Sequence, residues 1–238
     1  MCYNEPMKVK LITVGKLKEK YLKDGDKILD IGAGAGEYSL YFARKGYEVS
    51  ALELADANIA AFKKKLTPED KIDLVQGNAL DLSRYADKSF DIVLLFGPLY
   101  HLKNDADKQK CISEAKRVCK DGGKIFFAFI SNDFVFLTEF GYDVNYFSNG
   151  DYDKETFKLN DFPFVFHTVG AARKLLADGG INILHEVASD GASELLAARI
   201  NEMSDEDYTQ YLRYHFYICE KPELLGMTNH LLFMGEKK

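Results

Sequence analysis

The sequence lacks three features that would each point to a particular class of protein. Its four cysteines form no Cys-x-x-Cys pair and show no histidine spacing of the zinc type, which disfavours metal clusters and redox dithiols. No apolar run reaches the roughly 18 residues of a membrane span, and residues 1–20 lack the apolar core of a secretory signal. Positive charge is not in excess, since the formal net charge is −6, so nucleic acid is a disfavoured partner. We therefore expect a cytoplasmic protein with reduced thiols and no membrane partner.

The pattern of apolar residues predicts a doubly wound α/β domain. The chain has 238 residues, 47% of them hydrophobic and 29% charged, enough for one domain to bury its core without metals or disulfides. Seven short apolar runs have the length of strands: residues 27–31, 47–54, 72–76, 90–96, 124–130, 181–187 and 230–235. Four helical patterns lie between them: residues 38–45, 57–66, 105–119 and 169–177. Because strands and helices alternate, we expect βαβ units, a largely parallel sheet and helices on both of its faces.

Two segments interrupt this alternation. Residues 131–167 are rich in aromatic side chains but show neither helical nor strand periodicity, so we expect a long irregular excursion there. Residues 190–226 form a second excursion, with helical patterns over 193–203 and 205–219. The expected organisation is an N-terminal segment and one domain that contains both excursions as insertions: residues 1–24 and 25–238.

A glycine-rich loop follows the first predicted strand. Residues 30–36 read Asp-Ile-Gly-Ala-Gly-Ala-Gly and stand directly before a predicted helix. Glycines at this place permit a tight turn and let a ligand approach the backbone N–H groups at the helix N-terminus. The loop lacks the Gly-Lys-Ser/Thr ending of a triphosphate loop, and Glu37 stands where the dinucleotide fingerprint needs Gly or Ala. Both of those ligand classes are therefore disfavoured.

One acidic residue ends the second predicted strand. Glu53 lies 21 residues after Gly32, at the carboxyl edge of the expected sheet. An acid at this position can accept hydrogen bonds from both hydroxyls of a ribose. The alternative is a solvated charge at a strand end, and the glycine loop before it favours the ribose ligand.

These motifs resemble those of the class I S-adenosylmethionine-dependent methyltransferases. The glycine loop and Glu53 are followed in order by Gly-Asn-Ala-Leu-Asp at 77–81, Phe-Asp-Ile-Val at 90–93, Phe-Gly-Pro-Leu-Tyr-His-Leu at 96–102 and Val-Cys-Lys-Asp-Gly-Gly-Lys at 118–124. The resemblance therefore runs through roughly residues 25–130. It implies a Rossmann-like sheet of seven strands with a helical and aromatic cap, S-adenosyl-L-methionine as the cofactor and S-adenosyl-L-homocysteine as its product.

The resemblance also implies a role for each residue of the glycine loop. Gly32, Gly34 and Gly36 would wrap the methionine part of the cofactor. Asp30 would brace the loop and help to hold the amino group. Glu53 would bind the ribose.

Residues of three further loops would complete the cofactor site in such a protein. Leu54 would pack on the adenine. Asn78, through its side chain, and Ala79, through its backbone N–H, would meet the adenine edge, although Asn78 can also be read as a turn residue. Phe96 and Gly97 would lie near the amino group and the site of methyl transfer.

Three residues are candidates for work on the methyl acceptor. His101, in the loop after the fourth strand, could be a general base near neutral pH, or it could hydrogen-bond within that loop. Its neighbour Tyr100 is a second candidate, for which packing is the alternative role. His230 begins the last strand, which in this family runs antiparallel and starts on the active-site side, so it either braces or catalyses. Asn132 and Asp133 are read as a turn, and we expect no metal.

The expected acceptor is a small molecule under an aromatic cap that excludes water. The chain has no Asn/Asp-Pro-Pro-Tyr/Phe tetrapeptide, whose place is taken by residues 96–99, and no cysteine motif of the pyrimidine C5 type. Both absences lower the odds of a nucleic-acid substrate. The alternatives are an RNA or protein methyltransferase and a non-catalytic module that binds S-adenosylmethionine. Nothing in the sequence predicts the oligomeric state.

The N-terminus carries a second, shorter resemblance. Residues 7–25 are similar to the opening of the knotted ribosomal RNA pseudouridine methyltransferases, but nothing after Gly25 continues that pattern. We read its lysines as a solvated face, with Leu17, Tyr21 and Leu22 packing inward, and do not carry over an RNA substrate.

Overall fold

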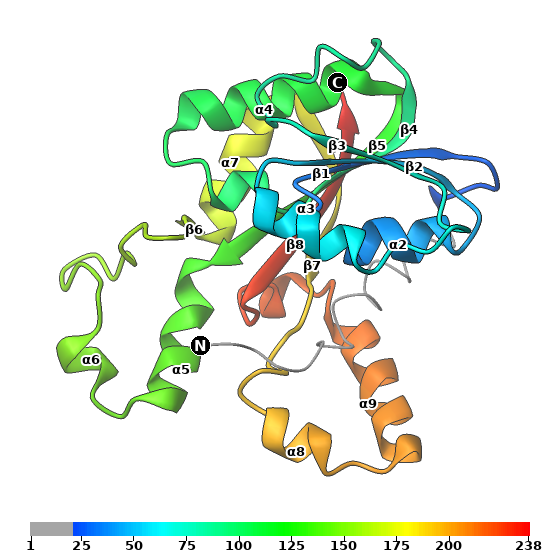
Figure 1. Cartoon of the computed structure of the whole chain (residues 1–238). Coiled ribbons are helices and arrows are strands. Elements are labelled where there is room, and N and C mark those ends of the chain that lie inside the picture. The colour runs from blue at the N-terminus through cyan, green and yellow to red at the C-terminus, as the bar shows by residue number, and fades with distance from the viewer. Residues whose placement is uncertain (1–20) are drawn as a thin grey trace.

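The computed structural model describes residues 21–238, so most of the N-terminal segment, including Leu17, lies outside the described residues. Seven strands follow one another across the sheet in the order β3-β2-β1-β4-β5-β8-β7 (Figure 1). Their bounds are β1 Lys27–Ile31, β2 Glu48–Glu53, β3 Ile72–Gln76, β4 Phe90–Leu95, β5 Cys119–Ser131, β7 Ile181–Ala188 and β8 His230–Lys237. β8 runs antiparallel to both of its neighbours, whereas β1 to β5 pair in parallel. The predicted seven-stranded, doubly wound sheet is confirmed, and a two-residue strand, β6 (Phe166–His167), adds to it beside β5.

Helices cover both faces of this sheet, as Figure 1 shows. Four helices follow strands of the expected alternation: α2 Glu37–Ala43, α3 Asp56–Lys63, α4 Asp105–Val118 and α7 Val169–Asp178. Successive residues of a strand point to opposite faces. Leu29 of β1 accordingly joins the core under α4 and α7, and Ile28 joins the core under α2. Both side chains are fully buried, so the strands are apolar on both faces as a covered parallel sheet requires.

The first excursion is helical at its start, so the prediction of an irregular segment was wrong there. α5 spans Asn132–Tyr142 and α6 spans Tyr146–Asn149. Ser131 caps α5 by accepting a hydrogen bond from the Phe134 N–H at 3.3 Å. The aromatic residues conceal the helical period because they lie on several faces of α5 and pack against one another, as Phe136 does against Tyr152 with ring centroids 4.7 Å apart.

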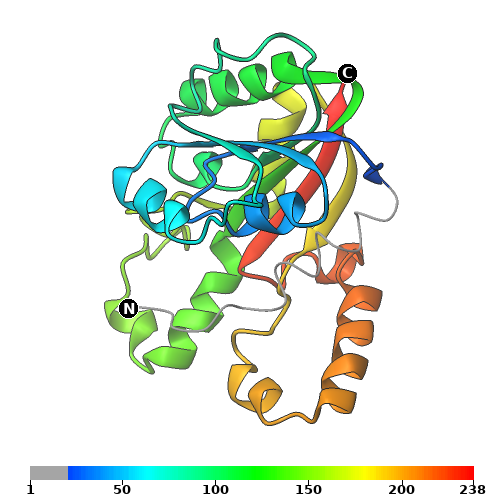
Figure 2. The same cartoon turned by 45° about the vertical axis from the view of Figure 1, so that its right-hand side comes forward.

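The second excursion contains a short helix α8 (Ala197–Asn201), a long helix α9 (Asp205–Ile218) and a 3₁₀ turn η2 (Pro222–Leu224). α8 is shorter than the expected 193–203, whereas α9 matches its prediction within one residue. Figure 2 shows α5, α6, α8 and α9 gathered at the end of the sheet where β5 ends and β8 begins. The two insertions therefore lie at the carboxyl edge of the parallel strands, where ligands bind in such sheets. Among helices within residues 21–238, none is long and apolar enough to cross a membrane.

Candidate cofactor and acceptor site

The glycine loop is tied to the end of β2. The backbone N–H groups of Gly32 and Ala33 both donate to the Leu52 carbonyl, at 2.8 and 3.0 Å. The next N–H along the chain, that of Gly34, donates to Glu53 Oε2 at 2.7 Å. The loop and the acid were predicted separately from the sequence, and the structure joins them in one unit.

Two of the glycines serve different purposes. Gly36 has φ +83° and stands directly before α2, and a Cβ there would lie 2.4 Å from the ring of Phe62. Gly34 has φ +56°, but a Cβ there would meet nothing within 4 Å. Gly36 is therefore required for packing within the protein, whereas the space beside Gly34 is open to a ligand.

Glu53 is buried, with 6% of its surface exposed, so the alternative of a solvated strand-end charge was wrong. Its carboxylate accepts hydrogen bonds from the N–H of Gly34, from the N–H of Ala55 at 2.9 Å and from the side-chain amide of Asn58 at 3.2 Å. A carboxylate has about four acceptor sites. One site therefore remains for a ribose hydroxyl, and the same residue braces the loops on either side of it.

Asp30 lies at the end of β1 with 1% of its surface exposed. It accepts a hydrogen bond from the Ser39 hydroxyl at 2.7 Å. Burial raises the pKa of its carboxyl to about 6, against the effect of Ser39, and the nearby charge of Glu53 adds to the rise. A ligand ammonium group beside Asp30 would reverse this effect by stabilising the carboxylate.

The three residues expected around the adenine lie near the ends of β2 and β3. Leu54 is 61% exposed, which leaves its side chain open to contact. Asn78 Oδ1 accepts a hydrogen bond from the Leu80 N–H at 2.9 Å, so this side chain does close a turn. Ala79 is buried in the core. Their contacts with adenine remain predictions.

The loop after β4 meets the glycine loop directly. A Cβ on Gly97 would lie 3.1 Å from the Gly32 carbonyl oxygen, so these two backbones pass closer than side chains would allow. Phe96 packs its ring against Tyr38 of α2, with centroids 4.7 Å apart. The loops after β1 and β4 therefore border one site, with the Tyr38 ring along it.

Tyr100 and His101 follow in the 3₁₀ turn η1 (Pro98–Tyr100) and just after it. Burial raises the pKa of Tyr100 to about 12, helped by the charges of Asp30 and Glu53, so its hydroxyl keeps its proton at neutral pH. Burial lowers the pKa of His101, and Glu53 opposes this weakly, so its imidazole is neutral at pH 7. The His101 ring lies 5.3 Å from that of Phe164, which belongs to the first excursion. The insertion thus contacts the loop that carries both candidates.

Two residues of the site were missed in the sequence analysis. Burial and the charges of Asp30, Tyr100 and Asp190 raise the pKa of Tyr38, which places its phenol among these groups. Its position in the first turn after the glycine loop was the available signal. Asp190, fully buried, lies 2.6 Å from His230 Nδ1 through its Oδ2 atom. Forty residues separate this pair, and no local pattern indicates it.

Asn132 holds the first insertion in place and does not form the expected turn. It is 4% exposed, accepts from the Leu159 N–H at 2.9 Å and donates to the Phe157 carbonyl at 3.0 Å. Within residues 21–238, no group of three or more His, Cys, Asp or Glu side chains is arranged to hold a metal ion.

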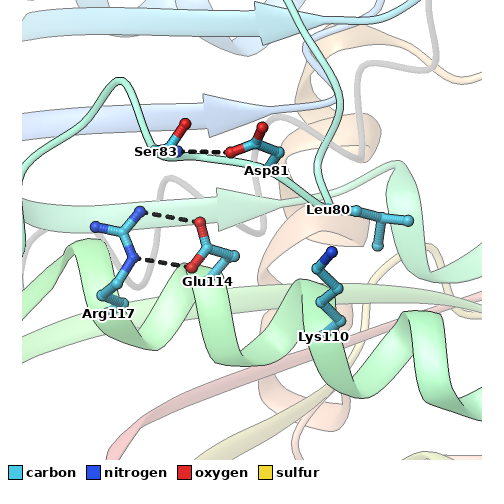
Figure 3. A pocket seen from close by; sticks show the side chains of 6 residues that line it. All are labelled: Leu80, Asp81, Ser83, Lys110, Glu114 and Arg117. Carbon is cyan, nitrogen blue, oxygen red and sulfur yellow. Dashed lines mark hydrogen bonds and ion pairs between the residues drawn. The ribbon is translucent and has the colours of Figure 1, made fainter.

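A cavity of about 460 Å³ opens between α4 and the loop after β3 (Figure 3). Its lining residues come from α4 and the loop after β3: Leu80, Asp81, Ser83, Lys110, Glu114 and Arg117. Arg117 pairs with Glu114 at 2.8 Å and donates to the carbonyls of Leu82 and Tyr85. These bonds clamp the loop after β3 to α4, so we assign this cavity a structural role.

Comparisons with known proteins agree with this fold. Residues 29–127 match the family profile described as "Methyltransferase domain". A demethylmenaquinone methyltransferase from Clavibacter sepedonicus is 34% identical over 121 residues, which cover 50% of this chain and 47% of that protein. A ubiquinone/menaquinone biosynthesis C-methyltransferase from Haemophilus ducreyi is 34% identical over 111 residues, 44% of this chain and 41% of that protein. The matching part of the chain therefore spans less than half of each of these relatives.

Solved structures show the same fold at lower identity. A SAM-dependent methyltransferase from Methanosarcina mazei superposes with a TM-score of 0.56 at 24% identity, covering 71% of this chain and 86% of that one. The PH0226 protein from Pyrococcus horikoshii superposes with a TM-score of 0.64 at 18% identity, covering 99% of this chain and 93% of that one. All ten residues expected at the cofactor lie within residues 29–127, the range that matches the family profile. Residues 29–127 are therefore a methyltransferase domain, and the chain has the fold of the class I S-adenosylmethionine-dependent methyltransferases.

Proposed function

We propose that this protein is an S-adenosylmethionine-dependent methyltransferase that acts on a small molecule. The observation that carries the proposal is the unit of glycine loop and Glu53, placed beside the loop after β4 inside a methyltransferase domain. The cofactor supplies a methyl group on a positively charged sulfur, which is already activated for displacement. The protein then has to bind the cofactor, orient the acceptor and exclude water.

The residues at the carboxyl edge of the sheet fit the cofactor. Open space lies beside Gly34, where the methionine part would run. One acceptor site remains on Glu53 for the ribose. Asp30, whose carboxyl has a pKa of about 6, would gain from an adjacent ammonium group. Leu54, Asn78 and Ala79 would border the adenine at the next two strand ends.

The two insertions support a small acceptor. They stand at the carboxyl edge of the sheet, and Phe164 of the first packs on His101. An aromatic cover of this kind can exclude water and hold a planar molecule. One of the relatives described above is named as a demethylmenaquinone methyltransferase and the other for ubiquinone/menaquinone biosynthesis, so both names refer to quinones and neither refers to a macromolecule. Both insertions lie beyond residue 127, where the family match ends, so the acceptor is proposed only as a class.

The fate of a labelled methyl group tests this function. Purified protein is incubated with methyl-labelled S-adenosylmethionine and a whole-cell extract, which is then separated into a low-molecular-weight filtrate, RNA and protein. We expect enzyme-dependent label in the filtrate and formation of S-adenosylhomocysteine. Label in RNA or protein would replace the proposed acceptor by a macromolecule. Cofactor binding with no label in any fraction would favour the non-catalytic module.

A further inference from the structure

A histidine and a buried aspartate form a pair at the base of the two insertions. β7 ends at Ala188, Asp190 follows two residues later, and β8 begins with His230. His230 Nδ1 lies 2.6 Å from Asp190 Oδ2, and the backbone N–H of His230 donates to Asp190 Oδ1 at 3.1 Å. Asp190 is fully buried, whereas 27% of the His230 side chain is exposed. The aspartate is thus inside the protein, and the imidazole is partly exposed.

The surroundings fix the aspartate firmly. Thr228 is fully buried and its hydroxyl donates to Asp190 Oδ1. The same hydroxyl oxygen accepts from the Gly191 N–H at 3.1 Å. The Ser189 N–H donates to the His230 carbonyl at 2.9 Å, which joins the ends of β7 and β8. A carboxylate is costly to bury unless hydrogen bonds satisfy it, and this one is held by several donors.

The strand register places this pair on the acceptor side of the cofactor site. Leu95 at the end of β4 is level with Phe127 of β5, and Ile130 of β5 is level with His230. Measured from Leu95, His230 therefore lies three residues farther along the strand direction and two strands to the side, which is roughly 10 Å in each direction. Tyr38 lies between the end of β4 and the His230–Asp190 pair. Its ring packs on Phe96, and the charges of Asp30 and Asp190 both raise the pKa of its phenol. A molecule of one or two rings could span this separation.

We propose that His230 removes the acceptor's proton during methyl transfer and that Asp190 is its positioning residue; this rests on the proposed function. Asp190 accepts the hydrogen of Nδ1, which fixes the tautomer in which Nε2 is the basic nitrogen. The acceptor is a phenol or hydroquinone that takes the methyl group on a ring carbon ortho or para to a hydroxyl, with this hydroxyl at His230 and the carbon toward the sulfur. The hydroxyl proton passes to Nε2 as the ring carbon forms the new bond to the methyl carbon and the carbon–sulfur bond breaks toward sulfur. The ring carbon then gives its hydrogen to water as a proton, and the hydroxyl takes a proton back from water, which restores the aromatic ring. The imidazolium, stabilised by Asp190, then returns the proton to water.

The other candidates fit this role less well. Tyr100 keeps its proton at neutral pH, so it can donate a hydrogen bond but is a poor base. His101 has no carboxylate partner within the described part of the chain, and its imidazole packs at a tilt against the rings of Tyr100 and Phe164. A base works best when a second group orients it. Among the three predicted candidates, His230 alone has such a group within residues 21–238.

The test compares variants in the labelling assay on the low-molecular-weight filtrate. His230→Gln should lower the rate by about 100-fold or more, the usual contribution of a general base. Asp190→Asn should lower kcat while KM for S-adenosylmethionine stays within about twofold, as expected when only the base is misaligned. Both variants should bind S-adenosylhomocysteine like the wild type. Imidazole added to His230→Ala should restore part of the lost rate, which a purely structural histidine would not show.

His185→Gln is the matched control. His185 Nδ1 also pairs with a carboxylate, Glu220 at 2.8 Å, but it lies within β7 and away from the glycine loop. Its replacement should leave the rate within about twofold, as for a substitution outside the site. If wild type and His230→Gln label the filtrate equally, the dyad proposal is overturned and the proposed function stands. If the wild type labels nothing, both fall.

Discussion

Replacing Glu53 by glutamine tests whether one buried carboxylate both braces the glycine loop and holds the cofactor. Its two oxygens accept from three donors, those of Gly34, Ala55 and Asn58. Glutamine keeps the shape but has a single acceptor oxygen with two sites, so at least one donor loses its partner. A buried donor without a partner costs about 1–3 kcal/mol, and we expect the melting temperature to fall by several degrees.

The loss of binding free energy for the cofactor should be at least as large as the loss of stability. A hydrogen bond between a ribose hydroxyl and a charged group is worth about 1.5–3 kcal/mol, which corresponds to a roughly 10- to 150-fold weaker binding. Isothermal titration with S-adenosylhomocysteine measures this directly. Glu48→Gln is the control, because Glu48 begins the same strand, is exposed and pairs only with Lys27 among the described residues. A Glu53→Gln protein that is folded and binds within about twofold of the wild type would refute the ribose assignment.

Three further predictions concern the same region and the core. Gly34→Ala should lower the melting temperature by a few degrees, because its φ of +56° strains any side chain by about 1–2 kcal/mol, and it should weaken cofactor binding, because its Cβ would enter the space beside the loop. Gly36→Ala carries the same strain and also places its Cβ 2.4 Å from the Phe62 ring, so it should destabilise the protein more; thermal melts and titrations separate the two. Affinity for S-adenosylhomocysteine should rise as pH increases through about 6, because the ligand ammonium binds ionised Asp30, and Asp30→Asn should remove this rise. Burial lowers the pKa of His167 from 6.5 to about 4. As the pH falls from 6.5 to 4, His167 therefore becomes protonated in the unfolded chain but not in the folded one, and the free energy of unfolding decreases by up to about 3 kcal/mol. Urea titrations should show that His167→Leu removes this part of the acid sensitivity.

Much of the fold follows from local pattern. The alternation of apolar strands and amphipathic helices, with a glycine loop after β1, determines a doubly wound sheet because parallel neighbours need crossover helices. The place of Glu53 at the carboxyl edge of the sheet could be predicted from the end of the second apolar run. The role of Glu53 as a brace could not, because that depends on how close the Gly34 N–H approaches in three dimensions.

The acceptor side was harder to predict for two physical reasons. The aromatic residues of α5 pack in a cluster of their own around Phe136 and Tyr152, so they do not show the one-sided period of a helix on a sheet. The pair of Asp190 and His230 is a contact between residues far apart in the chain. His230 could be suspected from its place at the start of the last strand, but its partner is visible only once β7 and β8 are side by side.

A crystal structure of the protein with S-adenosylhomocysteine tests the central claim most directly. We predict density for the ribose at Glu53, for the homocysteine part along Gly32 to Gly36 with its amino group near Asp30, and for the sulfur beside Phe96 on the side that faces His230. A ligand bound elsewhere on the molecule, or a sulfur directed away from His230 and the two insertions, would contradict the account.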